Sequence, residues 1–300
     1  MSVFSEILVS CRKALGLTQV ELLSELANYD DTFENLNNVT LSRWENGTTE
    51  TSLNRKRLLL KYFSQRLLLE SAPCNNMVKK RLELLYHPLA KFFEHNYASL
   101  IHNLPQLRVA LEAYNIISLH EHQELHRFEN IVNLEEASHA EGYYRTSAQS
   151  LQLLCQHPST FAITVEHNEQ HLGHFIMHKI KEDIVQRLIH YKMTEAEITV
   201  EDFASPSEKG SYYVHALYGV NPTIASIVNT KAYLYLYEHL KQIDNVVIFS
   251  TRKDGLRLAK AYGIEVIDTG VDESYNIIWS GMRSPVEDIL FSDTVLKLVF

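Results

Sequence analysis

The chain has 300 residues, 45% of them hydrophobic, with 10 glycines and 7 prolines, an ordinary composition for a globular protein of about two domains. The formal net charge is −9, yet residues 1–70 hold eight Lys/Arg and nine Asp/Glu, so most of the acidity lies in the rest of the chain. Three widely spaced cysteines exclude a disulfide framework and a zinc-binding spacing. No run approaches 18 apolar residues and no signal-peptide pattern is present, so we expect a cytoplasmic protein with no membrane partner.

Three short helices are predicted near the N-terminus. The first runs over about residues 5–15 and ends at Gly16. Thr18 can cap the second helix, because its hydroxyl accepts a hydrogen bond from a backbone N–H one turn later, and Glu21 completes a capping box. Asn37 can cap the third helix in the same way. Local chemistry therefore predicts where each of these helices starts.

The third helix combines an apolar underside with polar side chains that can reach a partner. Leu41 and Trp44 share one helix face, and Gly47 can end the helix in a left-handed conformation. The other positions with hydrogen-bonding side chains are Asn38, Thr40, Ser42 and Arg43. Readout of base edges in the major groove requires a short helix of this kind.

The segments LTQVEL (17–22) and TLSRWENG (40–47) resemble the helix-turn-helix of Xre/Cro-type DNA-binding proteins over about the first 65 residues. The resemblance implies a double-stranded DNA operator as partner and a homodimer on two half-sites. It implies that Gln19 contacts a DNA phosphate. It also implies that the third helix contacts base edges and the adjacent DNA backbone. The residues expected at DNA are Gln19, Asn38, Thr40, Ser42, Arg43 and Asn46.

One departure from that pattern concerns the connection between the two helices. The family joins them by a tight turn, whereas residues 28–36 add roughly eight residues here. We expect the insertion to change the angle at which the helix-turn-helix docks on DNA, while the motif itself is retained. The alternative interpretation is a helical hairpin that binds protein instead of DNA.

The middle of the chain is predicted to be helical. One helix covers about residues 53–69, and a break is expected over 71–76, where a proline and paired asparagines disfavour helix. Residues 77–126 again show helical spacing, divided by Pro88 and Pro105. This segment can carry a dimer contact, or its apolar face can pack on the C-terminal part of the same chain.

Two groups of histidines invite a metal hypothesis. His122 and His126 are four apart on a predicted helix, but they are not in an HExxH arrangement and no third ligand is set by spacing. A second group straddles a predicted hairpin and consists of His167, His171, His174 and His178. We expect surface or packing roles for both groups, and no metal.

From about residue 128 helices and strands alternate. The expected elements are helices at 147–155, 181–191, 222–241 and 254–262, strands at 161–167, 172–180, 212–220, 245–250, 264–268 and 277–280, and a charged connector at 195–203. This order, with SLQLLCQHPSTFAITVEHNEQHLGHFIMHKI, LYGVNP and LAKAYGIEVID, resembles the GNAT acyltransferase fold over roughly residues 128–300. The expected fold class is α+β: an all-α helix-turn-helix domain and connector, then a GNAT-like α/β domain with a mixed sheet.

The resemblance also argues against catalysis. It puts the Arg of the pyrophosphate loop on Ala225, the two loop glycines on Val228 and Thr230, the tyrosine acid on Ala259 and the cofactor-facing Asn on Arg252. Side chains on the loop hinder backbone approach to phosphate, and Ala259 has no proton to donate. Tyr262 is expected to face another direction. We therefore expect no catalytic residue, no metal and no resident cofactor.

The sequence thus predicts a transcriptional regulator, cytoplasmic and nucleoid-associated, of bacterial or phage type. Its expected parts are a DNA-binding domain (1–70), a helical connector (71–127) and a GNAT-like domain (128–300) that senses a ligand or binds a partner. Acyl-CoA or another small molecule is the expected effector. The expected pocket residues are Ala216, Leu217, Tyr218, Val220 and Thr223. The alternatives are an active N-acyltransferase tethered to DNA, and a protein-binding antirepressor or antitoxin-like subunit.

Overall fold

The structure is a computed structural model that describes residues 2–67, 73–96, 113–140 and 146–300. These divide into two compact units: residues 1–85 with 290–300, and residues 86–289. The division differs from the segments 1–70, 71–127 and 128–300 that we expected. Among the described residues, no helix is both long and apolar enough to cross a membrane.

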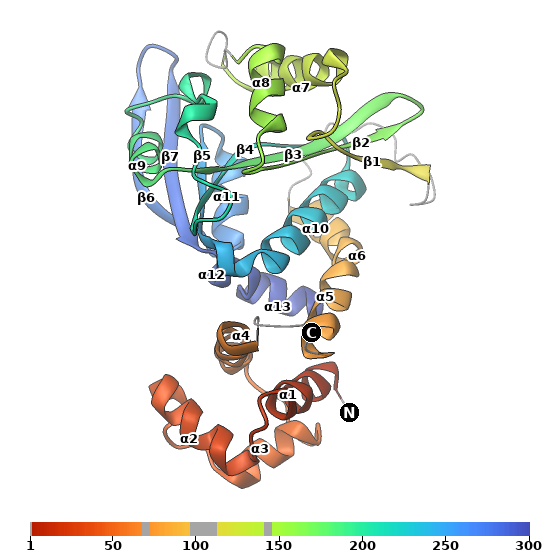
Figure 1. Cartoon of the computed structure of the whole chain (residues 1–300), viewed down its shortest axis with the longest axis vertical. Helices are drawn as coiled ribbons and strands as arrows, with labels where there is room; N and C mark the ends of the chain where they lie inside the picture. The colour runs from red at the N-terminus through yellow and green to blue at the C-terminus, as the bar shows by residue number, and fades with distance from the viewer. Residues whose placement is uncertain (1, 68–72, 97–112, 141–145) are drawn as a thin grey trace. The chain divides into compact units, whose positions relative to one another are not determined.

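The first unit consists of helices (Figure 1). They are α1 (Val3–Ala14), α2 (Gln19–Tyr29), the 3-10 turn η1 (Asp31–Phe33), α3 (Asn38–Glu45), α4 (Leu53–Leu67), α5 (Pro73–Glu83) and α13 (Asp293–Val299). The predicted caps are confirmed. Thr18 and Glu21 form the capping box of α2, and the Asn37 side chain accepts from the backbone N–H of Thr40. Gly16 and Gly47 have φ of 70° and 69°, a conformation that favours glycine.

The long connection between α2 and α3 is held by its own side chains. Asp30 accepts from the backbone N–H of Thr32 and so starts the 3-10 turn, and Phe33 within that turn is fully buried. Phe33 joins Leu26 and Leu41 in the core of this unit. The extra residues therefore form an ordered part of the helical unit, because burial of the Phe33 ring offsets the cost of ordering them.

The break that we expected over residues 71–76 is wrong at its C-terminal end. Helix α5 begins at Pro73, so the proline starts a helix where we expected irregular structure. A proline at the first helical position loses no intrahelical hydrogen bond, because that N–H has no partner in the helix. Pro88 likewise lies in the first turn of α6 (Tyr86–Asn96). Pro105 lies outside the described residues.

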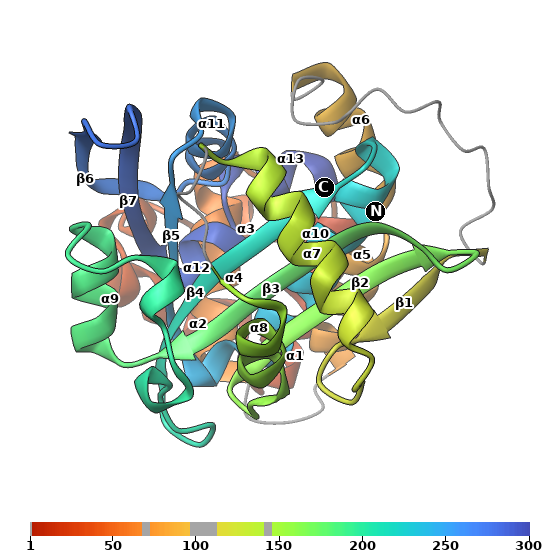
Figure 2. The ribbon, with the colours of Figure 1, turned by 90° about the horizontal axis from the view of Figure 1, so that it is seen from above.

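The second unit contains a seven-stranded sheet in the order β1-β2-β3-β4-β5-β7-β6 (Figure 2). The strands are β1 (Asn115–Ser118), β2 (Thr160–His167), β3 (Gln170–Ile180), β4 (Gly210–Gly219), β5 (Ile243–Ser250), β6 (Glu265–Asp272) and β7 (Ile277–Pro285). Neighbouring strands are antiparallel except β4 and β5, which are parallel. The expected α+β class with a mixed sheet is confirmed.

Strand β1 corrects the expectation of a wholly helical connector. Its residues pair with β2, from Asn115 opposite Glu166 to Ser118 opposite Ile163. A strand of four residues is too short to show a clear alternation of apolar and polar side chains. The helical spacing of apolar residues predicted for 77–126 also continues across these positions. Helix α7 (Leu125–Ser138) was also not predicted. The sheet therefore begins before the expected boundary at residue 128.

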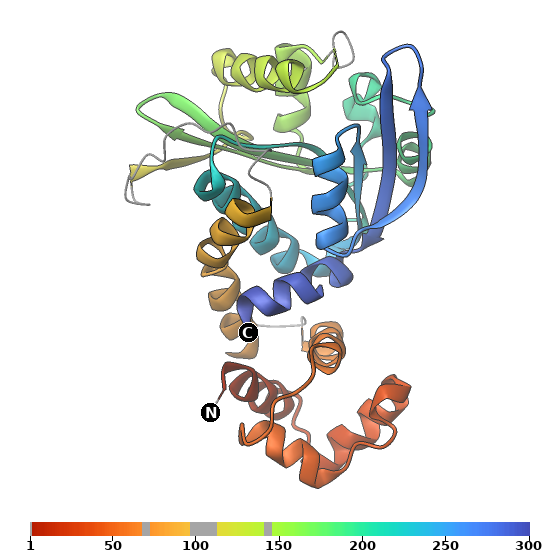
Figure 3. The same cartoon turned by 180° about the vertical axis from the view of Figure 1, so that it is seen from behind.

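Helices cover both faces of this sheet (Figure 3). Helices α7, α8 (Ala148–Gln156) and α9 (Glu182–Ile189) cover one face, where Phe128, Ile131 and Leu151 are fully buried. The opposite face carries α6, α10 (Pro222–Glu238) and α11 (Lys253–Ala261). The remaining elements are the 3-10 turns η3 (Glu195–Glu197), η4 (Val200–Asp202) and η5 (Leu240–Gln242), and α12 (Val286–Leu290).

Candidate functional site

The site lies where the two parallel strands separate. Strands β4 and β5 pair from Gly210 opposite Ile243 to Val214 opposite Ile248, and no further pair follows. At the next residue, His215, the register between β3 and β4 shifts, because Ile176 faces Ala216 while Met177 faces Val214. The extra residue is a β-bulge, which bends the strand that carries it. Beyond the bulge β4 diverges from β5 and leaves a gap in the sheet.

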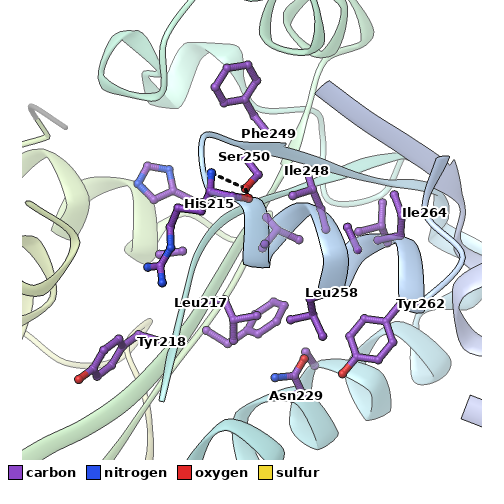
Figure 4. A pocket seen from close by; sticks show the side chains of 18 of the residues that line it. His215, Leu217, Tyr218, Asn229, Ile248, Phe249, Ser250, Leu258, Tyr262 and Ile264 are labelled. Atoms are coloured by element: carbon purple, nitrogen blue, oxygen red, sulfur yellow. Dashed lines mark hydrogen bonds between the residues drawn. The ribbon is translucent and has the colours of Figure 1, made fainter. Parts of the chain in front are cut away.

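A cavity of about 200 Å³ occupies this gap. Its walls come from β4, β5, α10 and α11, and side chains along these elements face it (Figure 4). The phenylalanine and tyrosine side chains of the wall are Phe93, Phe175, Tyr218, Tyr233, Phe249 and Tyr262. The titratable groups on the α7 side are Glu135, His139, Glu195 and His215. An apolar cavity with a few convergent polar groups is the usual form of a small-molecule site.

Three of the five expected pocket residues line this cavity, namely Ala216, Leu217 and Tyr218. Val220 and Thr223 do not. Val220 is buried beyond the strand end, where its N–H donates to Leu172 O, and Thr223 lies in the first turn of α10. Both residues lie beyond the C-terminal end of β4, where this strand contacts α10.

The start of α10 offers no cradle for a pyrophosphate. Asn221 caps the helix and Pro222 is its first residue, so Val228 and Thr230 are buried inside the helix. Their backbone N–H groups are therefore used within the helix. Gly219 approaches the first turn so closely that a Cβ there would lie 2.6 Å from the backbone N of Ala225. Strand end and helix are in direct contact at the position where the resemblance implies a phosphate-binding loop.

Our expectation for Tyr262 is wrong. Its side chain lines the same cavity as Ala259, and its ring makes an edge contact with Tyr233 at 5.5 Å (Figure 4). Tyr262 caps α11, so its direction depends on how that helix packs, which spacing along the sequence does not reveal. Arg252 also lines the cavity and is paired with Asp254 at 2.9 Å.

A chain of buried and partly buried hydrogen bonds ends at the α7 side of the cavity. Glu135 Oε1 lies 2.8 Å from His174 Nε2, and His174 Nδ1 lies 3.0 Å from His171 Nε2. His171 Nδ1 in turn lies 2.9 Å from the Thr164 hydroxyl. The chain joins α7 to the hairpin of β2 and β3. Among the described residues, no group of three or more His, Cys, Asp or Glu side chains is arranged to hold a metal ion.

Burial gives the titratable groups at this end different protonation states. It lowers the pKa of His171 to about 3 and that of His215 to about 4, so both imidazoles are neutral at pH 7. Burial also raises the pKa of Glu195 to about 8. For Glu135 burial opposes ionisation, but the hydrogen bond with His174 and the charge interactions with His174 and His139 hold its pKa below the usual value. One carboxyl is therefore ionised and the other protonated.

Sequence reasoning missed Glu135, Glu195 and His215. Residues 135, 195 and 215 come from a helix, a 3-10 turn and a bulge that are distant along the chain. The one available signal was the histidine pair His171 and His174, which we expected to have only a packing role. Their hydrogen-bonded chain is what orients Glu135.

The structural comparisons concern the fold of this unit. Solved structures that resemble the C-terminal part include the N-acyl amino acid synthase FeeM from uncultured soil microbes (16% identity, 59% of this chain, 91% of that chain, TM-score 0.40). Others are the ribosomal-protein-S18-alanine N-acetyltransferase from Escherichia coli (8%, 58%, 94%, 0.37) and the spermidine/spermine N-acetyltransferase SpeG from Vibrio cholerae (11%, 60%, 97%, 0.37). The fold of the C-terminal part is GNAT-like.

No protein-family profile matches the chain, and no curated protein matches it. The N-terminal helices are not assigned to a family by these comparisons. The structural likenesses, at 16% identity and below among those named, describe the GNAT-like fold and carry nothing about substrate or activity.

In the first unit, helix α3 brings the expected DNA-contacting residues together. Asn38, Arg43 and Asn46 are exposed, while Thr40 and Ser42 are half-buried. Gln19 lies at the start of α2, where its amide nitrogen donates to Glu45 at 2.7 Å. Val39, which we did not predict as a contact, is 60% exposed between Asn38 and Thr40.

The raised pKa of Glu195 predicts a pH-dependent stability. The folded state retains a proton that the unfolded chain releases above pH 4.5. The contribution of Glu195 to the free energy of unfolding is therefore full below pH 4.5 and is lost as pH rises to about 8. Replacing Glu195 with Gln should flatten the fall in unfolding free energy across that window. Urea titrations at a series of pH values test this, with the exposed Glu201→Gln as control. A variant that keeps the wild-type slope would contradict it.

Proposed function

We propose that the protein is a sequence-specific DNA-binding transcriptional regulator of the cytoplasm. In this proposal α2 and α3 dock on a double-stranded operator as a homodimer, and the cavity of the GNAT-like unit takes a small-molecule effector. Double-helical DNA carries base-specific patterns in a groove wide enough for one helix, so a short helix with exposed polar side chains suits it.

The observation that carries the proposal is the arrangement of α3. Leu41 and Trp44 are buried in the helical core, so the helix is fixed while its opposite side stays exposed. At the C-terminal end Glu45 accepts from both Arg12 and Gln19, which ties α3 to the end of α1 and the start of α2. A rigidly held helix keeps Asn38 and Arg43 in one geometry, as discrimination between bases requires.

Replacing Arg43 with Ala should weaken discrimination for the selected operator by about 1–3 kcal/mol, because a bidentate contact to a base is lost. The operator would first be selected from random duplexes with the full chain, and binding would then be measured at fixed salt. A palindrome with half-sites about one helical turn apart would support the dimer.

The matched control is Arg187→Ala, an exposed arginine on α9 in the other unit, which removes the same charge. If Arg43→Ala and Arg187→Ala bind the operator equally, the proposed DNA surface is wrong. Selection of no sequence by the full chain, together with loss of a protein partner in Arg43→Ala, would favour the antirepressor or antitoxin-like alternative.

Acyl transfer in the same cavity is the second candidate, and Tyr262 is the observation that favours it. Its hydroxyl-bearing ring lies in the cavity wall, where it can act as a general acid. The contact between Gly219 and the first turn of α10 argues against an acyl-CoA donor. Turnover of acetyl-CoA or a longer acyl-CoA by the full chain, lost in Tyr262→Phe, would establish this function.

A further inference from the structure

Val39 is an aliphatic side chain at the middle of the exposed face of α3. It is the second residue of that helix and is 60% exposed. At about 100° per residue, it lies about 170° around the helix from the midpoint between the buried Leu41 and Trp44. Its neighbour Thr40 is half-buried. Val39 therefore points directly away from the core of the helical unit.

Arg43 lies one turn further along the same face. Residues four apart are neighbours on the surface of a helix, and both Val39 and Arg43 are exposed. The N-terminal residues of a recognition helix are the ones that meet base edges when the helix enters the major groove. Docking of α3 on an operator therefore desolvates the isopropyl group of Val39 against base edges, beside the cation of Arg43.

The major groove offers one methyl group for an aliphatic side chain to cover. The base edges present nitrogen and oxygen donors and acceptors, and thymine alone adds a C5-methyl group. An aliphatic group placed over a polar edge displaces water without replacing its hydrogen bonds, which is unfavourable. Placed over a methyl group, it removes two apolar surfaces from water. Val39 thus favours thymine and disfavours the other bases at the position that it covers.

The position of this isopropyl group is well fixed. A valine in a helix adopts essentially one side-chain rotamer. The start of α3 is held by Asn37, which accepts from the N–H of Thr40 at 2.9 Å. The end is held by Glu45, which accepts from Arg12 and Gln19. A small apolar contact discriminates between bases only when the supporting structure places it reproducibly, and α3 meets that condition.

We propose that Val39 determines specificity at one base pair of each operator half-site by covering the C5-methyl group of a thymine. This role of Val39 rests on the proposed function, in which α3 reads the operator. Val39 and Arg43 are about 6 Å apart along the helix axis, and successive base pairs are about 3.4 Å apart. The thymine therefore lies within about two base pairs of the base that Arg43 contacts.

The test replaces single thymines in one half-site of the selected operator with deoxyuridine, which removes only the methyl group. At one of these thymines the full chain should lose about fourfold in affinity, as expected when one buried carbon of this kind is removed. That thymine should lie within about two base pairs of the position at which Arg43→Ala relaxes selectivity. At the same position 5-methylcytosine should bind about fourfold better than cytosine, because the methyl group returns on a base with a different hydrogen-bonding pattern.

A pair of valine variants assigns the methyl contact to its side chain. Val39→Ala removes the two outer methyl groups without changing charge, and it should bind the thymine and deoxyuridine operators with equal affinity. The control is Val20→Ala, which makes the same change at a valine of α2 that is 66% exposed. It should keep the fourfold difference between thymine and deoxyuridine.

The outcomes separate this contact from DNA binding as such. A selected operator in which no replacement by deoxyuridine weakens binding of the full chain would overturn the thymine contact and leave the proposed function standing. A difference that persists in Val39→Ala, or that is lost in Val20→Ala, would also overturn it. Selection of no sequence by the full chain would overturn the proposed function and the thymine contact together. The deoxyuridine measurement uses the unaltered protein, so it does not depend on the folding of any variant.

Discussion

Glu45→Ala is expected to lower the unfolding free energy of the helical unit by about 3 kcal/mol. Glu45 is 5% exposed and accepts from Arg12 at 2.6 and 3.0 Å and from Gln19 at 2.7 Å. Truncation leaves the Arg12 guanidinium, whose side chain is 14% exposed, without its charged partner. The loss of one partner of a buried pair is costly because the other charge stays desolvated.

The tryptophan fluorescence of this unit offers a direct measurement. The chain has two tryptophans, and one of them, Trp44, adjoins Glu45 in α3. In a Trp279→Phe background, urea unfolding of the full chain would follow Trp44 alone. The control is Glu34→Ala, an exposed carboxylate in the same unit. If both substitutions shift the transition equally, the Arg12–Glu45–Gln19 contact does not stabilise the unit as we argue.

Gly281→Ala is expected to destabilise the second unit by about 3 kcal/mol, the upper part of the usual range for overpacking. Gly281 lies in β7, between Phe249 of β5 and Asp268 of β6. A Cβ at this position would lie 2.0 Å from the backbone O of Ile189, the last residue of α9. The new Cβ is attached directly to the backbone of β7, and the oxygen that it meets belongs to the backbone of α9. No side-chain rotation therefore relieves the clash.

Trp279, two residues before Gly281, reports on this change. Its ring is stacked with Phe249 and lies 5.4 Å from that of Tyr191, which follows α9. In a Trp44→Phe background, Gly281→Ala should shift the urea transition to lower concentration and alter the emission of Trp279. The control is Gly210→Ala, where a Cβ meets the flexible Lys179 side chain at 3.4 Å and Ala204 Cβ at an ordinary contact distance of 3.7 Å. Equal stability of the two variants would show that α9 can move away at little cost.

Much of the local structure was determined by the sequence alone. Thr18, Glu21 and Asn37 satisfy backbone N–H groups within one turn, so the starts of α2 and α3 follow from neighbouring residues. Asn168 and Glu169 form the turn predicted between β2 and β3, with φ of 50° and 64°. Such signals need no knowledge of distant parts of the chain.

Other features depended on distant partners and were missed or misread. Strand β1 is four residues long and exists as a strand because β2 supplies its hydrogen bonds. The direction of Tyr262 depends on the rotation of α11 against β5, which a local pattern does not specify. The separation of β4 from β5 depends on the bulge at His215, one extra residue that is visible only in the pairing with β3.

The candidate site shows the same division. From sequence, Ala216, Leu217 and Tyr218 could be placed at the end of a strand beside a cavity. Glu135 and Glu195 could not, because a carboxylate in a helix or turn is ordinarily on the surface. Packing of α7 on β3 buries Glu135 against His174, and desolvation together with that hydrogen bond then sets its charge. Local chemistry thus determined where helices and strands begin, and only the tertiary structure decided which charges are buried together, because protonation depends on neighbours that the fold brings in from distant parts of the chain.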